Sequence, residues 1–172
     1  MDSQKIITVL AILASAYVIA GLAQPNLRYF NREEFGLFWP LIDDDLLEKL
    51  DELRHQWGKP IFISPVEGGV GRVHEDSQSQ HNILNTYGVV RAVDIFPAGA
   101  SGESMTTAEA EQFVDLAKNI GFTGIGVYTD TYYDNRPWIM VHVDVRLDRE
   151  VGNPALWSRI EQEYQNIRSA FL

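Results

Sequence analysis

The chain has 172 residues, no cysteine and a formal net charge of −10. This length suggests one domain with an appendage, and it suffices to bury a core without disulfides or structural metals. The lack of cysteine excludes disulfides and thiolate metal sites, so a transition-metal site would use His, Asp or Glu. The acidic balance, with no basic stripe, argues against a nucleic-acid partner.

The amino-terminal stretch differs from the rest of the chain. Residues 6–23 read IITVLAILASAYVIAGLA and carry no charge. This run lies at the lower edge of the length that a membrane-spanning helix needs, and its end also suits signal-peptide cleavage. The sequence predicts a signal-anchor or transmembrane segment over 1–24, a polar linker over 25–33 and a globular domain over 34–172. A buried helix of a soluble fold is the alternative.

Two helices are predicted from their end signals. Three aspartates at 43–45 precede the amphipathic pattern LLEKLDELRHQW, which ends at Gly58. Acidic residues suit the positive end of a helix, and glycine is common just after its last turn. Thr106 and Glu109 form a capping box for a second helix that ends at Gly121.

Three stretches predict strands. PIFIS at 60–64 is a short apolar run, and GIGVY at 124–128 carries glycines where another group packs close to the backbone. WIMVHVDVR at 138–146 alternates, so its aliphatic residues share one face while His142 and Asp144 share the other. The second face is typical of the floor of a site.

A third helix is predicted at the carboxyl end. Asn153-Pro154 is typical of a helix start. Apolar residues then recur at helical spacing on one expected buried side, namely Leu156, Trp157, Ile160, Tyr164 and Ile167.

One charge interrupts the apolar run AVDIF. An ionised carboxylate at Asp94 is costly among aliphatic neighbours unless it is paired, hydrogen-bonded or bound to a cation. Two histidines and one carboxylate are a common ligand set for catalytic zinc, which makes His81, Asp94 and His142 candidate ligands. An ion pair of Asp94 with Arg91 or Arg146 is the alternative.

The segments SQHN…GVVRAVDIF and GIGVY…WIMVHVDVR resemble the M15 family of zinc peptidases. This group contains D-alanyl-D-alanine carboxypeptidases and L-alanyl-D-glutamate endopeptidases, including many phage endolysins. Its Ser-x-His segment, Ala-x-Asp strand and late-strand histidine correspond here to His81, Asp94 and His142, which the resemblance implies as zinc ligands. It also implies that Arg72, after a glycine-rich turn, binds a substrate carboxylate. The resemblance covers about residues 34–147.

The chain departs from the family pattern at two places. Most members have the first histidine where this chain has Tyr87, so the match needs an insertion, which a loop tolerates at small entropic cost. Members often carry an acidic residue where this chain has Ile139. Asp144 is the best substitute as general base, with Asp134 and Glu75 as alternatives.

The resemblance implies an α+β fold in which a small, mainly antiparallel sheet carries the site and helices cover its other face. It implies zinc-dependent hydrolysis of peptidoglycan stem peptides, with water activated by the metal. We expect the protein to be exported, either anchored in the inner membrane or periplasmic, and to contact the membrane through residues 6–23. It would act as an endolysin, or alternatively among phage virion proteins. Two alternatives are a non-catalytic virion or cell-wall structural module that keeps the fold, and a membrane-anchored binding protein.

Overall fold

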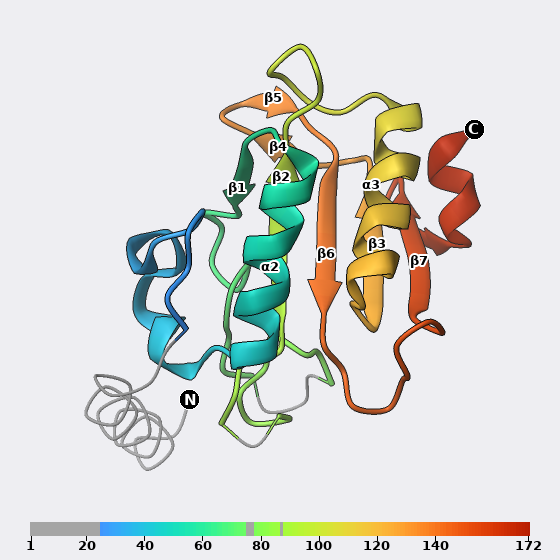
Figure 1. Cartoon of the computed structure of the whole chain (residues 1–172). Coiled ribbons are helices and arrows are strands. Elements are labelled where there is room, and N and C mark those ends of the chain that lie inside the picture. The colour runs from blue at the N-terminus through green and yellow to red at the C-terminus, as the bar shows by residue number, and fades with distance from the viewer. Residues whose placement is uncertain (1–24, 75–77, 87) are drawn as a thin grey trace.

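A computed structural model describes residues 25–74, 78–86 and 88–172 (Figure 1). Their elements in chain order are η1 (Arg32–Leu41), α2 (Asp44–Trp57), β1 (Ile61–Ile63), β2 (Ala92–Pro97), α3 (Thr107–Ile120), β3 (Gly124–Tyr128), β4 (Tyr132–Tyr133), β5 (Arg136–Pro137), β6 (Met140–Asp144), β7 (Ala155–Ile160), β8 (Glu163–Gln165) and η2 (Ile167–Phe171). The elements η1 and η2 are 3-10 helices. The predicted α+β class is confirmed.

Six strands form the main sheet, in the order β1-β2-β6-β3-β7-β8. The neighbours β3 and β7 are parallel, and the other four neighbouring pairs are antiparallel. The sheet is therefore mixed, with mainly antiparallel pairing as expected. The strands β4 and β5 form a separate two-stranded hairpin.

The helices α2 and α3 cover the same face of the sheet (Figure 1). Their ends follow the sequence signals: Asp43 caps α2, Thr106 and Glu109 form the capping box of α3, and Gly58 and Gly121 end the two helices with positive φ. The helix-facing side of the sheet is aliphatic and joins the main core, with Val93, Ile95, Val127, Val141 and Val143. The opposite face carries Asp94 and His142 beside a second, smaller apolar cluster that includes Phe96 and Trp138.

The third predicted helix is wrong. Residues 155–160 form β7, which extends parallel to β3 and then turns back into β8 through Glu161 and Gln162, both with positive φ. The exposed edge of β3 needs a hydrogen-bonding partner, and strand pairing there overrides the helical spacing of the apolar residues. Consequently Trp157 lies on the sheet and faces the open side.

The segment expected to be a linker packs against α2. The backbone N–H groups of Arg28, Tyr29 and Phe30 donate to the carboxylate of Asp51, and the Phe30 side chain is buried. The predicted segment at 1–24 lies outside the described residues. Within the described ranges, no helix has the length and apolar character needed to cross a membrane.

Candidate metal centre

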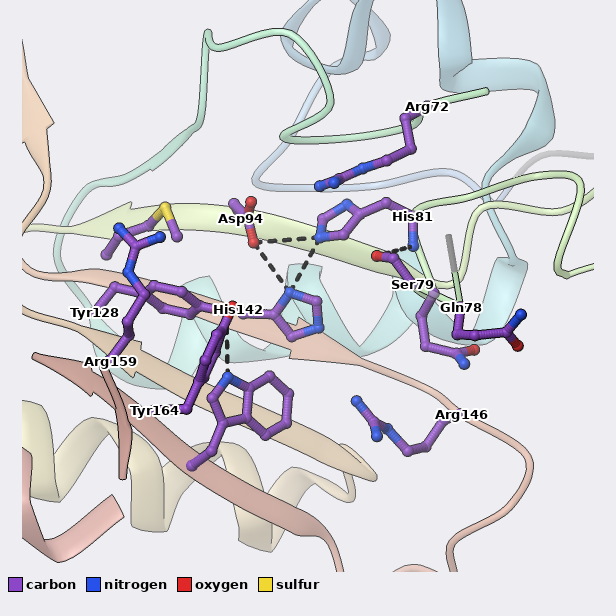
Figure 2. Close-up of a pocket in the computed structure, with 13 residues that line it drawn as sticks. Arg72, Gln78, Ser79, His81, Asp94, Tyr128, His142, Arg146, Arg159 and Tyr164 are labelled. Carbon is purple, nitrogen blue, oxygen red and sulfur yellow. Dashed lines mark hydrogen bonds and ion pairs between the residues drawn. The ribbon is translucent and has the colours of Figure 1, made fainter. Parts of the chain in front are cut away.

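Two neighbouring strands and one loop bring His81, Asp94 and His142 together (Figure 2). Asp94 in β2 pairs directly with His142 in β6, so both side chains emerge side by side on the open face. His81 lies in the loop before β2. That loop is held by main-chain hydrogen bonds, because Arg72 N donates to His81 O at 2.9 Å and Ile83 N donates to Arg72 O at 3.2 Å.

The three side chains present one ligand atom each to a common point. His142 Nδ1 lies 3.0 Å from His81 Nε2 and 3.0 Å from Asp94 Oδ1, and the last two atoms are 3.3 Å apart. Zinc–nitrogen and zinc–oxygen bonds of about 2.0–2.1 Å at tetrahedral angles separate ligand atoms by roughly 3.3 Å. The group can therefore hold a metal ion without rearrangement of the strands.

The second nitrogen of each imidazole is already engaged. His81 Nδ1 lies 2.8 Å from the carbonyl oxygen of Val70, and His142 Nε2 lies 3.0 Å from Oδ2 of Asp144. These two oxygens can only accept hydrogen bonds. In the neutral rings the proton therefore lies on His81 Nδ1 and on His142 Nε2. The lone pairs of the other two nitrogens then converge on the Asp94 carboxylate. Three converging acceptors need a cation or a proton between them, and such outer partners are typical of metal-binding histidines.

Asp94 is ionised in this environment. Burial alone would raise its pKa, but the adjacent His142 and His81 rings outweigh burial and hold the pKa well below its usual range. The ion-pair alternative does not hold, since Arg91 pairs with Asp43 and Arg146 pairs with Asp144. Within the described residues, Asp94 therefore depends on the two histidines.

Asp144 lies on the far side of the His142 ring from Asp94. Its carboxylate is fully buried and receives hydrogen bonds from His142 Nε2 and from Arg146 Nε, the latter at 2.9 Å to Oδ1. Burial alone would raise the pKa of Asp144, but the hydrogen bonds from Arg146 and His142 lower it to about 2. The ionised Asp144 carboxylate is therefore placed to orient the His142 ring. The general-base role of Asp144 stays a prediction.

The two glycines of β3 make room for these side chains, as their spacing predicted. Gly124 lies opposite Asp144, and a Cβ there would overlap the Asp144 carboxylate. Gly126 lies between His142 and Trp157, and a Cβ there would overlap the indole of Trp157. That indole packs against His142, with ring centroids 5.2 Å apart.

Replacing Gly126 by alanine is expected to lower the free energy of unfolding by about 1–3 kcal/mol, because the added methyl group overpacks the face that holds Trp157. Urea denaturation measures this cost. In a Trp157→Val background the same replacement should cost much less, since the indole that it meets is gone. Equal costs in both backgrounds would contradict the close packing of Gly126 and Trp157.

We expect the stability of the metal-free protein and its affinity for zinc to depend on pH through His142. Burial lowers the pKa of His142, but hydrogen bonds with Asp144 and Asp94 outweigh it and raise the pKa to about 9. Because the unfolded-state value is about 6.5, the protonated ring stabilises the fold fully below this pH. That contribution is lost as the pH rises to about 9. Zinc needs the neutral ring, so zinc affinity should rise about tenfold per pH unit over the same range.

Two titrations check this pH dependence. Urea denaturation of the metal-free chain follows its stability, and competition with a chromogenic chelator follows zinc affinity, both between about pH 6.5 and about pH 9. Stability and zinc affinity should move in opposite directions. A zinc affinity that stays flat across this range would contradict proton release from His142.

A cavity of about 420 Å³ opens over the metal centre. Its lining includes the candidate ligands together with Arg72, whose Nη2 donates to Gly68 O at 3.1 Å. Arg72 Nε is buried and has no hydrogen-bond partner within the described ranges. A second cavity of about 340 Å³ adjoins the first, and both share Arg72, Asp94, Met140 and Arg159.

The lining also includes Trp157, Arg159 and Tyr164, which the sequence did not place at the site. All lie in the carboxyl-terminal strands β7 and β8, where the apolar spacing had favoured a helix. Tyr128 also lines the cavity, and its hydroxyl accepts a hydrogen bond from Trp157 Nε1 at 3.1 Å.

The alternative general bases lie elsewhere. Asp134 is exposed in the turn between β4 and β5 and does not line either cavity described above. Glu75 and Tyr87 fall outside the described residues.

No protein-family model, curated protein or solved structure matches the chain.

Proposed function

We propose that the protein is a zinc-dependent peptidase that hydrolyses peptidoglycan stem peptides. The observation that carries the proposal is the convergence of two imidazole nitrogens and one carboxylate oxygen at 3.0–3.3 Å, with each remaining imidazole nitrogen fixed by an acceptor. Two histidines and one carboxylate with an open cavity above them suit a catalytic zinc site. The resemblance to the M15 peptidases supports the substrate class.

The residues of the centre have distinct proposed roles. His81, Asp94 and His142 hold the metal, and Asp144 keeps His142 in the tautomer whose Nδ1 can bind it. Arg72 binds a carboxylate of the stem peptide from the cavity wall. A bound zinc ion would supply a Lewis acid for the peptide carbonyl and lower the pKa of a water molecule.

The proposed setting follows from the substrate. Peptidoglycan lies outside the cytoplasmic membrane, so we propose that residues 1–24 direct export or anchor the chain in the inner membrane. A phage endolysin or a virion-associated peptidase would fit this arrangement. A membrane-fractionation experiment with the full-length chain tests it: recovery only in the cytosolic fraction would contradict export and anchoring.

The test of the activity measures metal content and cleavage together. The full-length chain, purified in a mild detergent, is analysed for zinc, iron, manganese and copper, and is then incubated with a soluble stem pentapeptide. We expect close to one zinc per chain and cleavage that a chelator abolishes and added zinc restores. Cleavage that survives complete removal of the metal would exclude the proposed mechanism.

A second candidate is a non-catalytic wall or virion module that retains the fold. One observation favours it: Asp94 is the only carboxylate among the described residues that line the cavity over the metal centre. A proton acceptor separate from the metal ligands is common in such enzymes. Stoichiometric zinc with no cleavage of any stem peptide would favour this candidate over the peptidase.

A further inference from the structure

Three arginines surround the metal centre of a chain whose formal net charge is −10. Arg72, Arg146 and Arg159 line the cavity of about 420 Å³, and Asp94 is the one carboxylate among its described lining residues. Because the rest of the chain is acidic, this concentration of guanidinium groups is a local feature of the site. Arg146 and Arg159 each pair with an aspartate, so a bound anion would be recognised by the guanidinium donors that remain.

The three guanidinium groups differ in how many donors they keep for a ligand. Arg146 directs Nε and Nη2 to the buried carboxylate of Asp144. Arg72 keeps its buried Nε unpaired within the described ranges. Arg159 places Nε and Nη2 on the same oxygen of Asp130, at 3.2 and 3.1 Å, and its Nη1 makes no hydrogen bond in the described part of the chain.

Arg159 is held in place by its surroundings. The second oxygen of Asp130 accepts a hydrogen bond from the backbone of Gln162 at 2.9 Å, which fixes the carboxylate that holds the guanidinium. The guanidinium also lies over the ring of Tyr128, 4.9 Å from its centroid. A guanidinium that is already ordered loses less side-chain entropy when it binds a carboxylate.

Arg72 and Arg159 lie on either side of Asp94 (Figure 2). They come from different parts of the chain, since Arg72 follows the glycine-rich turn after β1 and Arg159 belongs to β7. Both border the two adjoining cavities. A peptide that crosses the metal centre from one cavity to the other would therefore pass both guanidinium groups.

We propose that Arg159 forms a second carboxylate-binding subsite, so that the substrate is a peptide with two carboxylates, one bound by Arg72 and one by Arg159. The carboxylates would lie on the two sides of the amide bond presented to the metal centre. This inference rests on the proposed peptidase function for the identity of the ligand. Its test measures binding alone, so its failure can be told apart from a failure of catalysis.

Four forms of one probe separate the two subsites. The probe is the acetylated stem pentapeptide acetyl-L-Ala-D-isoGlu-L-Lys-D-Ala-D-Ala, with both carboxylates free, with either one amidated, and with both amidated. Calorimetry with the full-length chain in detergent and excess chelator gives each affinity without turnover. Arg159→Ala is made in an Asp130→Asn background, so that no unpaired carboxylate faces the ligand, and Asp130→Asn alone is the reference. Arg149→Ala removes an exposed arginine elsewhere and is the matched control.

We expect Arg159→Ala to weaken binding of the diacid by about 10-fold to 100-fold, the usual effect of losing a hydrogen bond to a charged group. This variant should become insensitive to amidation of one carboxylate and keep its sensitivity to the other. Arg72→Ala should show the reverse pattern, and Arg149→Ala should bind all four forms like the wild type.

Three results would overturn the second subsite: equal losses for all four forms in Arg159→Ala, a wild-type affinity that does not change with amidation, or no binding of the diacid. A chain that binds the diacid in this crossed pattern but never cleaves it would support the subsite and contradict the peptidase. Zinc-dependent cleavage with amidation-independent binding would contradict the subsite alone.

Discussion

Replacing His142 by alanine is expected to weaken zinc binding by well over 100-fold and to abolish zinc-dependent cleavage. Loss of an outer partner of a metal ligand already costs about 10-fold to 100-fold in affinity, and loss of a ligand must cost more. His142 Nδ1 lies 3.0 Å from both His81 Nε2 and Asp94 Oδ1, so no other described side chain replaces it at the same point.

Thermal unfolding with and without zinc provides a measurement that does not depend on activity. A ligand that binds only the folded state raises its stability by RT ln(1 + [L]/Kd), so zinc should raise the Tm of the wild type and not that of His142→Ala. His55→Ala is the control, because His55 is exposed in α2 and stacks on Tyr29 outside the site. An equal zinc-induced rise in Tm for His142→Ala would sink the ligand assignment.

The parts of the fold that the sequence predicted correctly depend on local chemistry. The ends of α2 and α3 follow from capping side chains and from Gly58 and Gly121, whose positive φ suits glycine. The alternation in β6 separates the aliphatic face from the face with His142. The two glycines of β3 predicted a close approach because glycine weakens the interior of a strand, and a neighbouring group that fills the space of the missing Cβ offsets this cost.

The parts that the sequence left open depend on contacts between distant segments. The apolar spacing after residue 153 fits a helix as well as a strand, and only the free edge of β3 decides for β7. As a result Trp157 and Arg159 reach the cavity without a signal of their own. The number of residues between His81 and Asp94 likewise does not predict how close their side chains lie. Main-chain hydrogen bonds with Arg72 set the position of the loop that carries His81.

Replacing Asp144 by alanine is expected to cost about 3–5 kcal/mol of unfolding free energy, as removal of one member of a buried ion pair does. The side chains of Arg146 and His142 would each lose a hydrogen-bond acceptor, and the carboxylate that is removed is fully buried. Urea denaturation of the metal-free chain measures this loss. Glu111→Ala removes an exposed carboxylate on α3 and should change stability by less than about 0.5 kcal/mol.

Replacing Asp144 by asparagine separates the positioning role from the general-base role. An amide NH2 facing His142 Nε2 would donate to it, which moves the ring proton to Nδ1 and directs it at Asp94 and His81 in place of a metal. A histidine held in the wrong tautomer loses its function even when its position is kept, so we expect zinc affinity to fall about 10-fold to 100-fold. Saturating zinc should then restore most of kcat.

If Asp144 instead takes the proton from water, kcat would fall at saturating zinc while zinc affinity stays near that of the wild type. The buried ion pair with Arg146 leads us to expect the first result, because a carboxylate held by a guanidinium and whose pKa is lowered to about 2 is a weak base.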